Sequence, residues 1–75
     1  MIGTWGTAGV RCKIKSGYEQ EGLEGEALCW VTTRTSGMRW IVVVWDDEDE
    51  PDLHKAHGLV LKHPDDKGWS DAKLS

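Results

Sequence analysis

Four aromatic side chains and the carboxylates beside them are the residues of this sequence whose chemistry points most directly to binding. The chain has five Trp in 75 residues, with one Tyr and no Phe. One small core needs fewer large rings than this, so we expect some of them to lie at the surface. Rings flanked by carboxylates can hold cationic side chains or Pro-rich peptides by stacking and cation–π contact. The sequence therefore predicts a partner-binding face made of Tyr18, Trp30, Trp40, Trp45, Asp46, Asp47 and Glu48.

Two members of this face, Trp30 and Trp40, also suit the core of a small domain, and the sequence leaves that alternative open. Large aromatic anchors dominate binding energies, whereas charges at the rim set specificity and association rate. We therefore expect Trp45→Ala to abolish partner binding and to leave the fold intact. Loss of the fold in that variant would instead place Trp45 in the core.

The acidic run of residues 46–52 contains six carboxylates and one Pro. Dense carboxylates can bind calcium, but this spacing lacks the Gly and the final Glu of an EF-hand loop. A solvated turn that discourages strand pairing at an edge is the simpler interpretation. The run also suits a docking patch for a basic partner, and we expect no metal or cofactor here.

Three histidines and two cysteines could ligate zinc. His54 and His57 stand three residues apart, and Cys12 or Cys29 could complete a tetrahedral set. The sequence contains no Cys-x-x-Cys pair, so a zinc-stabilised mini-domain is kept as an alternative. We expect two free thiols, and a disulfide only if the strands that carry them are neighbours.

Basic residues at alternating positions raise a second alternative. Arg11, Lys13 and Lys15 share one face if their segment is a strand, and Arg34 and Arg39 could extend a track for phosphates. The formal net charge of −4 argues against nucleic acid as a general partner, because phosphate binding relies on clustered cations.

No constellation in the sequence points to catalysis. There is no Gly-rich phosphate loop before a helix, and no nucleophile stands with an evident base. The first residues lack the basic and apolar regions of a signal peptide, and no apolar run approaches the roughly 18 residues of a membrane helix. We therefore expect a cytoplasmic, non-enzymatic protein without a membrane span.

The elements that must position these residues are strands. Residues 10–15 alternate strictly between apolar and basic, and residues 26–33 and 38–45 are rich in β-branched and aromatic residues. Residues 53–62 predict one or two further strands, with one helical turn in their first half. We expect residues 1–9 to be a flexible lead-in, residues 10–62 a barrel, and residues 63–75 a polar tail.

The alternation also predicts which side chains share a face. In the first strand the apolar residues point inward and the basic residues outward. In the next two strands both faces are apolar, as in central strands of a curled sheet. The expected sets are Val10, Cys12 and Ile14; Ala27, Cys29 and Val31 opposite Leu28 and Trp30; and Ile41, Val43 and Trp45 opposite Trp40, Val42 and Val44.

The predicted fold is all-β: a small SH3-like barrel of about five short antiparallel strands with one short helical turn. Short strands joined by short loops, without a long helix, favour a curved sheet that hides its edges. An OB-like barrel is the alternative, but it commonly needs more residues and a helix that this sequence does not offer.

Two local motifs carry a resemblance to known proteins. The turn Gly22-Leu-Glu-Gly-Glu26 after an alternating strand is similar to SH3-like barrels of the KOW and Tudor kind. Together with the step Lys55-Ala56-His57, it resembles the variable chain of ferredoxin–thioredoxin reductase. That resemblance implies a non-catalytic subunit that supports a catalytic partner. The chain departs from that family in its acidic run and in its many Trp.

The sequence thus predicts a non-catalytic protein–protein interaction module, or an accessory subunit, that binds through an aromatic and acidic face. A KOW-like nucleic-acid-binding barrel and a zinc-stabilised mini-domain remain alternatives. Neither the partner nor an oligomeric state follows from the residues.

Overall fold

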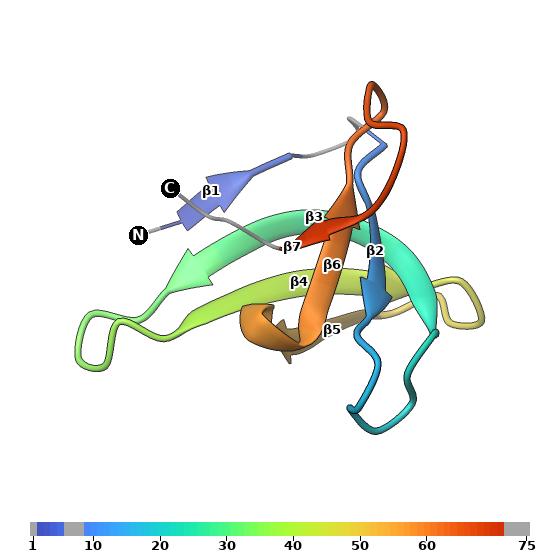
Figure 1. Ribbon diagram of the computed structural model, residues 1–75. Coiled ribbons are helices and arrows are strands. Elements are labelled where there is room, and N and C mark those ends of the chain that lie inside the picture. The colour runs from blue at the N-terminus through green and yellow to red at the C-terminus, as the bar shows by residue number, and fades with distance from the viewer. Residues whose placement is uncertain (1, 6–8, 72–75) are drawn as a thin grey trace.

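The computed structural model describes residues 2–5 and 9–71, which form seven antiparallel strands and one 3-10 turn (Figure 1). The all-β prediction is confirmed, and so is one short helical turn within residues 53–62, which lies at Ala56–Gly58, in the middle of that range rather than wholly in its first half. No helix in the described residues is long and apolar enough to cross a membrane. The elements are β1 (Ile2–Thr4), β2 (Arg11–Ile14), β3 (Glu24–Thr32), β4 (Arg39–Trp45), β5 (Pro51–Lys55), η1 (Ala56–Gly58), β6 (Leu59–Lys62) and β7 (Ser70–Asp71).

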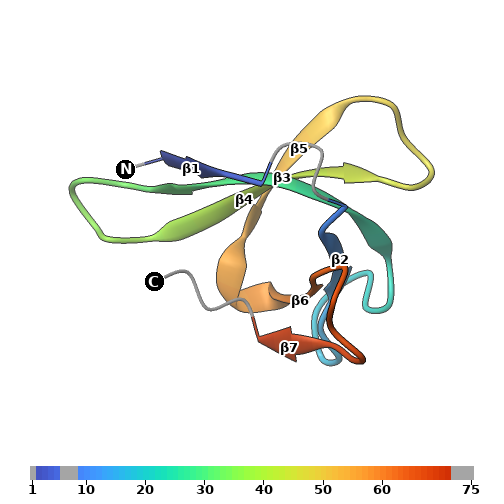
Figure 2. The ribbon, with the colours of Figure 1, turned by 90° about the horizontal axis from the view of Figure 1, so that it is seen from above.

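The strands lie in the order β5-β4-β3-β2-β6-β7, and β1 also pairs with β3. Seen from above, the sheet curls so that β2 and β6 come to face β4 and β5 across the interior (Figure 2). The two end strands of this order, β5 and β7, do not pair with each other in the described residues. The sheet is therefore strongly curved but not closed into a barrel, which corrects that part of the sequence prediction.

The side chains of β5 explain why this edge stays open. Pro51 has no amide hydrogen to offer. The amide of Leu53 donates to the Asp52 carboxylate at 2.8 Å, and the His54 ring nitrogen Nδ1 lies 2.9 Å from the carbonyl oxygen of Lys55. The backbone amide of Leu53 and the backbone carbonyl of Lys55, with which another strand would pair, are thus already bonded within β5. Such local bonding is a common protection of sheet edges.

The bend of the sheet lies in β3. Its first half pairs with β2, its second half pairs with β1, and its register against β4 shifts between Ala27 and Cys29. Such a bulge bends a strand and changes which side chains share a face. Ala27 pairs with buried Val43, whereas Cys29 and Val31 pair with residues of the outer face of β4. The expectation that Ala27, Cys29 and Val31 share one face is therefore wrong.

The core lies between the two halves of the curled sheet. The prediction for β2 is confirmed, because Val10, Cys12 and Ile14 are all buried. Burial raises the pKa of the Cys12 thiol to about 12, so this thiol is unreactive at neutral pH. The buried apolar residues are Val10, Cys12, Ile14, Ala27, Ile41, Val43, Trp45, Ala56, Leu59 and Leu61.

Indole rings attach the two terminal segments to the sheet. The rings of Trp5 and Trp30 lie 4.6 Å apart, and a Cβ on Gly3 would overlap the Trp30 ring, so β1 needs glycine there. At the other end the Lys13 ammonium lies 4.5 Å from the centre of the Trp69 ring. The segments expected as a lead-in and a tail thus each contribute a short strand, β1 and β7.

Candidate functional site

The four aromatic residues of the predicted face lie in different parts of the molecule. Trp45 is 4% exposed and belongs to the core, where its Nε1 donates to the Asp52 carboxylate at 3.2 Å. Trp30 points inward against Trp5. Trp40 is half-buried on the opposite, outer face of β4, with Lys55 5.8 Å from its ring centre. The structure therefore does not gather these rings into one groove.

Tyr18, in the loop between β2 and β3, is the member of that set with an exposed ring, at 42%. Its ring centre lies 6.0 Å from that of His57 in η1. Buried Gly58 lies beneath the side chains of Tyr18 and His54, since a Cβ there would lie 2.9 Å from His54 Cε1 and 3.4 Å from Tyr18 Cδ1. Tyr18, His54 and His57 form one surface above it, named here the Tyr18 patch.

Backbone hydrogen bonds fix the loop that carries Tyr18. The Lys15 amide donates to the Gly58 carbonyl at 2.9 Å, which ties the start of the loop to η1. The end is tied to β2, where the Gly22 amide donates to the Ile14 carbonyl at 3.0 Å. Leu23 packs against the core. The ring of Tyr18 is therefore presented from a braced loop, at low ordering cost on binding.

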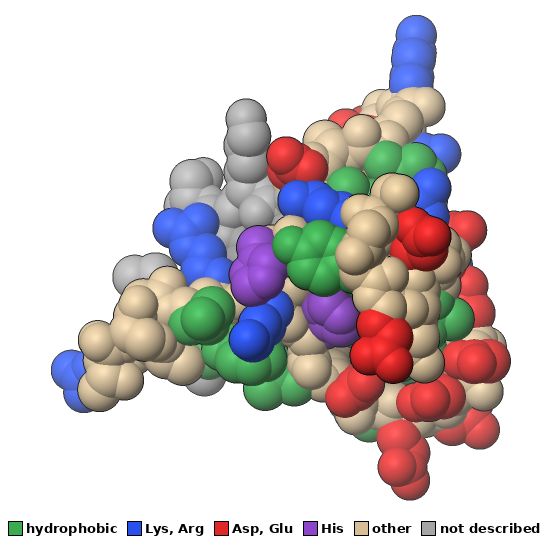
Figure 3. Space-filling view, turned by 60° about the horizontal axis from the view of Figure 1, so that its bottom comes forward, with side chains coloured by type: hydrophobic (Ala, Val, Ile, Leu, Met, Phe, Trp, Pro, Cys, Tyr) green, Lys and Arg blue, Asp and Glu red, His purple; other side chains and the backbone are tan. Residues whose placement is uncertain are grey.

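Acidic side chains border the Tyr18 patch. Four carboxylates in residues 19–26 and six in residues 46–52 make ten of the thirteen in the chain. The two segments meet in space, because the Asp46 amide donates to the Glu24 carbonyl at 3.1 Å. The space-filling view shows red acidic side chains gathered on one side of a face that carries both hydrophobic and His side chains (Figure 3). This region is named the acidic end.

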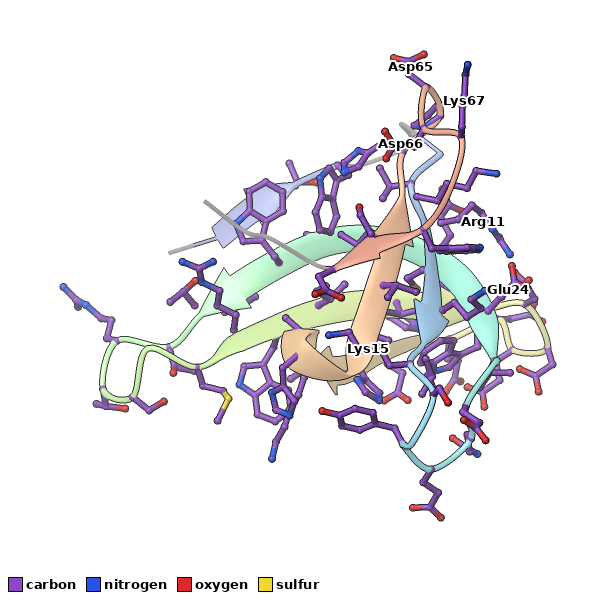
Figure 4. The ribbon with its side chains drawn as sticks, viewed as in Figure 1. Arg11, Lys15, Glu24, Asp65, Asp66 and Lys67 are labelled. Carbon is purple, nitrogen blue, oxygen red and sulfur yellow. The ribbon has the colours of Figure 1, made fainter. Side chains whose placement is uncertain are left out.

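Arg11 is the cation built into the acidic end. Its guanidinium binds the Asp46 carboxylate with two hydrogen bonds, one of them 3.0 Å long, and lies 4.0 Å from Glu24. Figure 4 shows Arg11 and Glu24 at the same edge of the molecule. The hydrogen bond from Arg11 holds the pKa of Asp46 below its ordinary value. Asp46 is thus held by Arg11, whereas Asp47 and Glu48 are exposed on the same turn.

Replacing Arg11 tests this pairing. We expect Arg11→Gln to raise the pKa of Asp46, because the variant loses the ionic hydrogen bond that favours the carboxylate. A depressed folded-state pKa adds stability above the ordinary pKa, and this stability is lost as pH falls through the depressed value. The variant should therefore be less stable than the wild type at neutral pH, and the two should converge in strong acid. Carboxyl NMR titration and urea unfolding at both pH values measure this; an unchanged Asp46 titration would contradict it.

The basic row of β2 is engaged within the molecule. Arg11 binds Asp46, the Lys13 ammonium lies over the Trp69 ring, and Lys15 Nζ lies 3.2 Å from the Asp71 carboxylate. Arg34 and Arg39 lie away from this row, in the turn after β3 and at the start of β4. Because three of the five cations already have partners within the molecule and the other two lie elsewhere, the five do not form one continuous surface for phosphates.

The zinc alternative also lacks a gathered ligand set. Cys12 is a buried free thiol, and Cys29 is a half-buried free thiol on the outer face of β3. In the part of the chain that the structure describes, no three His, Cys, Asp or Glu side chains stand close enough to share a metal ion.

Sequence reasoning does not identify two members of the Tyr18 patch, His54 and His57, as a protein-binding surface. The signal is present in part, since Lys55-Ala56-His57 stands out as a motif and residues 53–62 predict a helical turn. What the sequence does not reveal is that the β2–β3 loop lies beside that turn. This proximity depends on the pairing of β2 with β6.

Comparisons with protein-family models find no match to this chain, and searches of curated proteins and of solved structures find no significant match either.

Proposed function

We propose that this protein is a non-catalytic interaction module that binds a basic segment of a partner protein through the Tyr18 patch and the acidic end. The exposed Tyr18, braced beside His57 and followed in its loop by Glu19 and Glu21, is the observation that carries the proposal. A Lys or Arg side chain can lie over the Tyr18 ring while Glu19 and neighbouring carboxylates attract it. Rim charges of this kind increase the association rate and select cationic partners.

The resemblance to SH3-like barrels is part of this proposal. It is supported by the bent β3, by η1 between β5 and β6, and by the return of β6 to pair with β2. An accessory role beside a larger subunit fits a small domain without a catalytic constellation. We place the protein in the cytoplasm, where its free thiols Cys12 and Cys29 would remain reduced.

Removing the Tyr18 ring is the direct test of the proposed surface. Peptides selected from a random displayed library on the wild-type protein should be enriched in Lys and Arg. We expect Tyr18→Ala to weaken their binding about tenfold or more, a loss of about 1.4 kcal/mol, because an aromatic anchor carries much of the energy at such a site. Fluorescence polarisation with a labelled monovalent peptide measures this loss.

Leu53→Ala is the matched control, because Leu53 is the other large apolar side chain that the described residues expose, at 52%. It should leave peptide affinity unchanged, and both variants should keep the unfolding midpoint of the wild type. Selection of peptides without cationic residues, or equal binding by Tyr18→Ala, would disprove the proposed surface.

A further inference from the structure

A second surface, independent of the proposed function, lies on the outer face of the β3–β4–β5 sheet. Its apolar side chains neither belong to the core nor pack against it, as far as the described residues show. The most exposed is Leu53, at 52%, and the others are half-buried. The outer face consists of Cys29, Val31, Trp40, Val42, Val44 and Leu53.

The strand register arranges this outer face in three rows that cross the sheet. The central row joins the apolar residues Cys29, Val42 and Leu53 and continues to Thr4 of β1. On one side of it a row runs from Val31 through Trp40 to Lys55. On the other side a row runs from Glu26 through Val44 to Pro51. The central row therefore separates a row that ends in the cation Lys55 from a row that contains the carboxylate of Glu26, beyond which Arg11 of β2 is bound to Asp46.

Charge is polarised along the same direction over β3, β4 and β5. Residues 27–45, which include the turn between β3 and β4, contain no Asp or Glu, and this end carries the exposed cations Arg34 and Arg39 together with Lys55. The opposite end of the sheet is the acidic end already described. An apolar strip between opposite charges is complementary to a copy of itself turned end for end.

We propose that the outer face binds a second copy of this chain, with a two-fold axis that lies in the interface and crosses the strands along the central row. Such an axis reverses the strand direction, so the basic end of each copy faces the acidic end of the other. Lys55 of one copy then lies over Pro51 of the other, next to Glu50. The two sheets pack face to face about 10 Å apart, as aligned sheets do.

Pairing of strand edges is not the mode of association, because the edge groups of β5 are already bonded to Asp52 and His54. The face is also small: three strands about 4.8 Å apart and roughly five residues of each cover about 250 Å² on each copy, well below the roughly 800 Å² per partner of a standard interface. The dimer is therefore weak, and the fraction of chains in dimers rises with protein concentration. Added salt weakens the dimer markedly, because salt screens the exposed charges at the two ends of the interface.

Leu53→Glu tests the face without removing a core side chain. The wild-type protein should show a rising average mass in sedimentation equilibrium as concentration increases, toward twice the mass of one chain. The variant should dissociate at least about tenfold more readily, because it places a carboxylate in the apolar row that the two copies share. Tyr18→Ala should associate like the wild type, and Leu53→Glu should keep the wild-type unfolding midpoint.

A pair of charge reversals tests the end-for-end arrangement. Lys55→Glu and Glu50→Lys should each weaken self-association, because each places like charges opposite one another. An equimolar mixture should associate more strongly than either variant alone, since both contacts of the mixed dimer then join opposite charges. A wild-type protein that stays monomeric at millimolar concentration would overturn the proposal, as would a mixture no stronger than its components. Failure here leaves peptide binding by the Tyr18 patch intact, so the two proposals fail separately.

Discussion

Trp45→Ala is expected to cause a large loss of stability in the domain. Trp45 is 4% exposed and belongs to the core, and its Nε1 donates to Asp52. Truncating a buried aromatic ring to Ala costs about 3–5 kcal/mol. A chain of this length has roughly 4–11 kcal/mol of total stability. The variant should therefore lose roughly half of the free energy of unfolding and unfold at a clearly lower urea concentration than the wild type. This replaces the expectation from the sequence that Trp45→Ala leaves the fold undisturbed.

Urea unfolding followed by circular dichroism measures this effect, and Trp40→Ala is the matched control. Trp40 lies in the same strand but is half-buried on the outer face, so its loss should cost clearly less than the loss of Trp45. A Trp45→Ala protein with a wild-type unfolding midpoint would show that the core is not centred on this ring.

Gly25→Ala is expected to have the second large effect on stability. Gly25 is buried in β3 opposite Trp45, and a Cβ there would lie 2.6 Å from the Val44 carbonyl oxygen and 2.9 Å from the Trp45 Cα. Both contacts are with backbone, which cannot rotate away as a side-chain end can. The strand pair must separate locally, and overpacking of this kind costs about 1–3 kcal/mol or more.

Gly68→Ala is the control for this substitution, because Gly68 has open space around it and lies in the loop before β7. Thermal unfolding should show a clearly lower midpoint for Gly25→Ala and little change for Gly68→Ala. Equal midpoints for the two variants would contradict the close approach of β3 and β4 at Gly25.

The strands that alternate or repeat β-branched residues could be predicted from the sequence. Residues 10–15 and 38–45 became β2 and β4, and their buried residues Cys12, Ile41 and Val43 face the core as the period of two requires. The acidic turn and the helical turn before β6 were also found, because Pro, Gly and dense charge mark breaks between strands.

The remaining features depend on contacts between distant segments. No local pattern marks β1, whose attachment needs Gly3 under the Trp30 ring. No local pattern marks the register shift after Ala27, which moved Cys29 and Val31 to the outer face. The four aromatic residues of the predicted face do not lie together for the same reason. Alternation along a strand shows which residues share a face, but not which of the two faces packs against the core.

Mapping a bound peptide by NMR tests the central claim most directly. Amide shifts are followed while a selected Lys- and Arg-containing peptide is added to the labelled protein at low protein concentration. We predict saturable shifts centred on Tyr18, Glu19, His57 and Gly58, and their loss in Tyr18→Ala. Shifts centred instead on the Arg34 and Arg39 end of the sheet, or no saturable shift at all, would contradict the assignment of this surface.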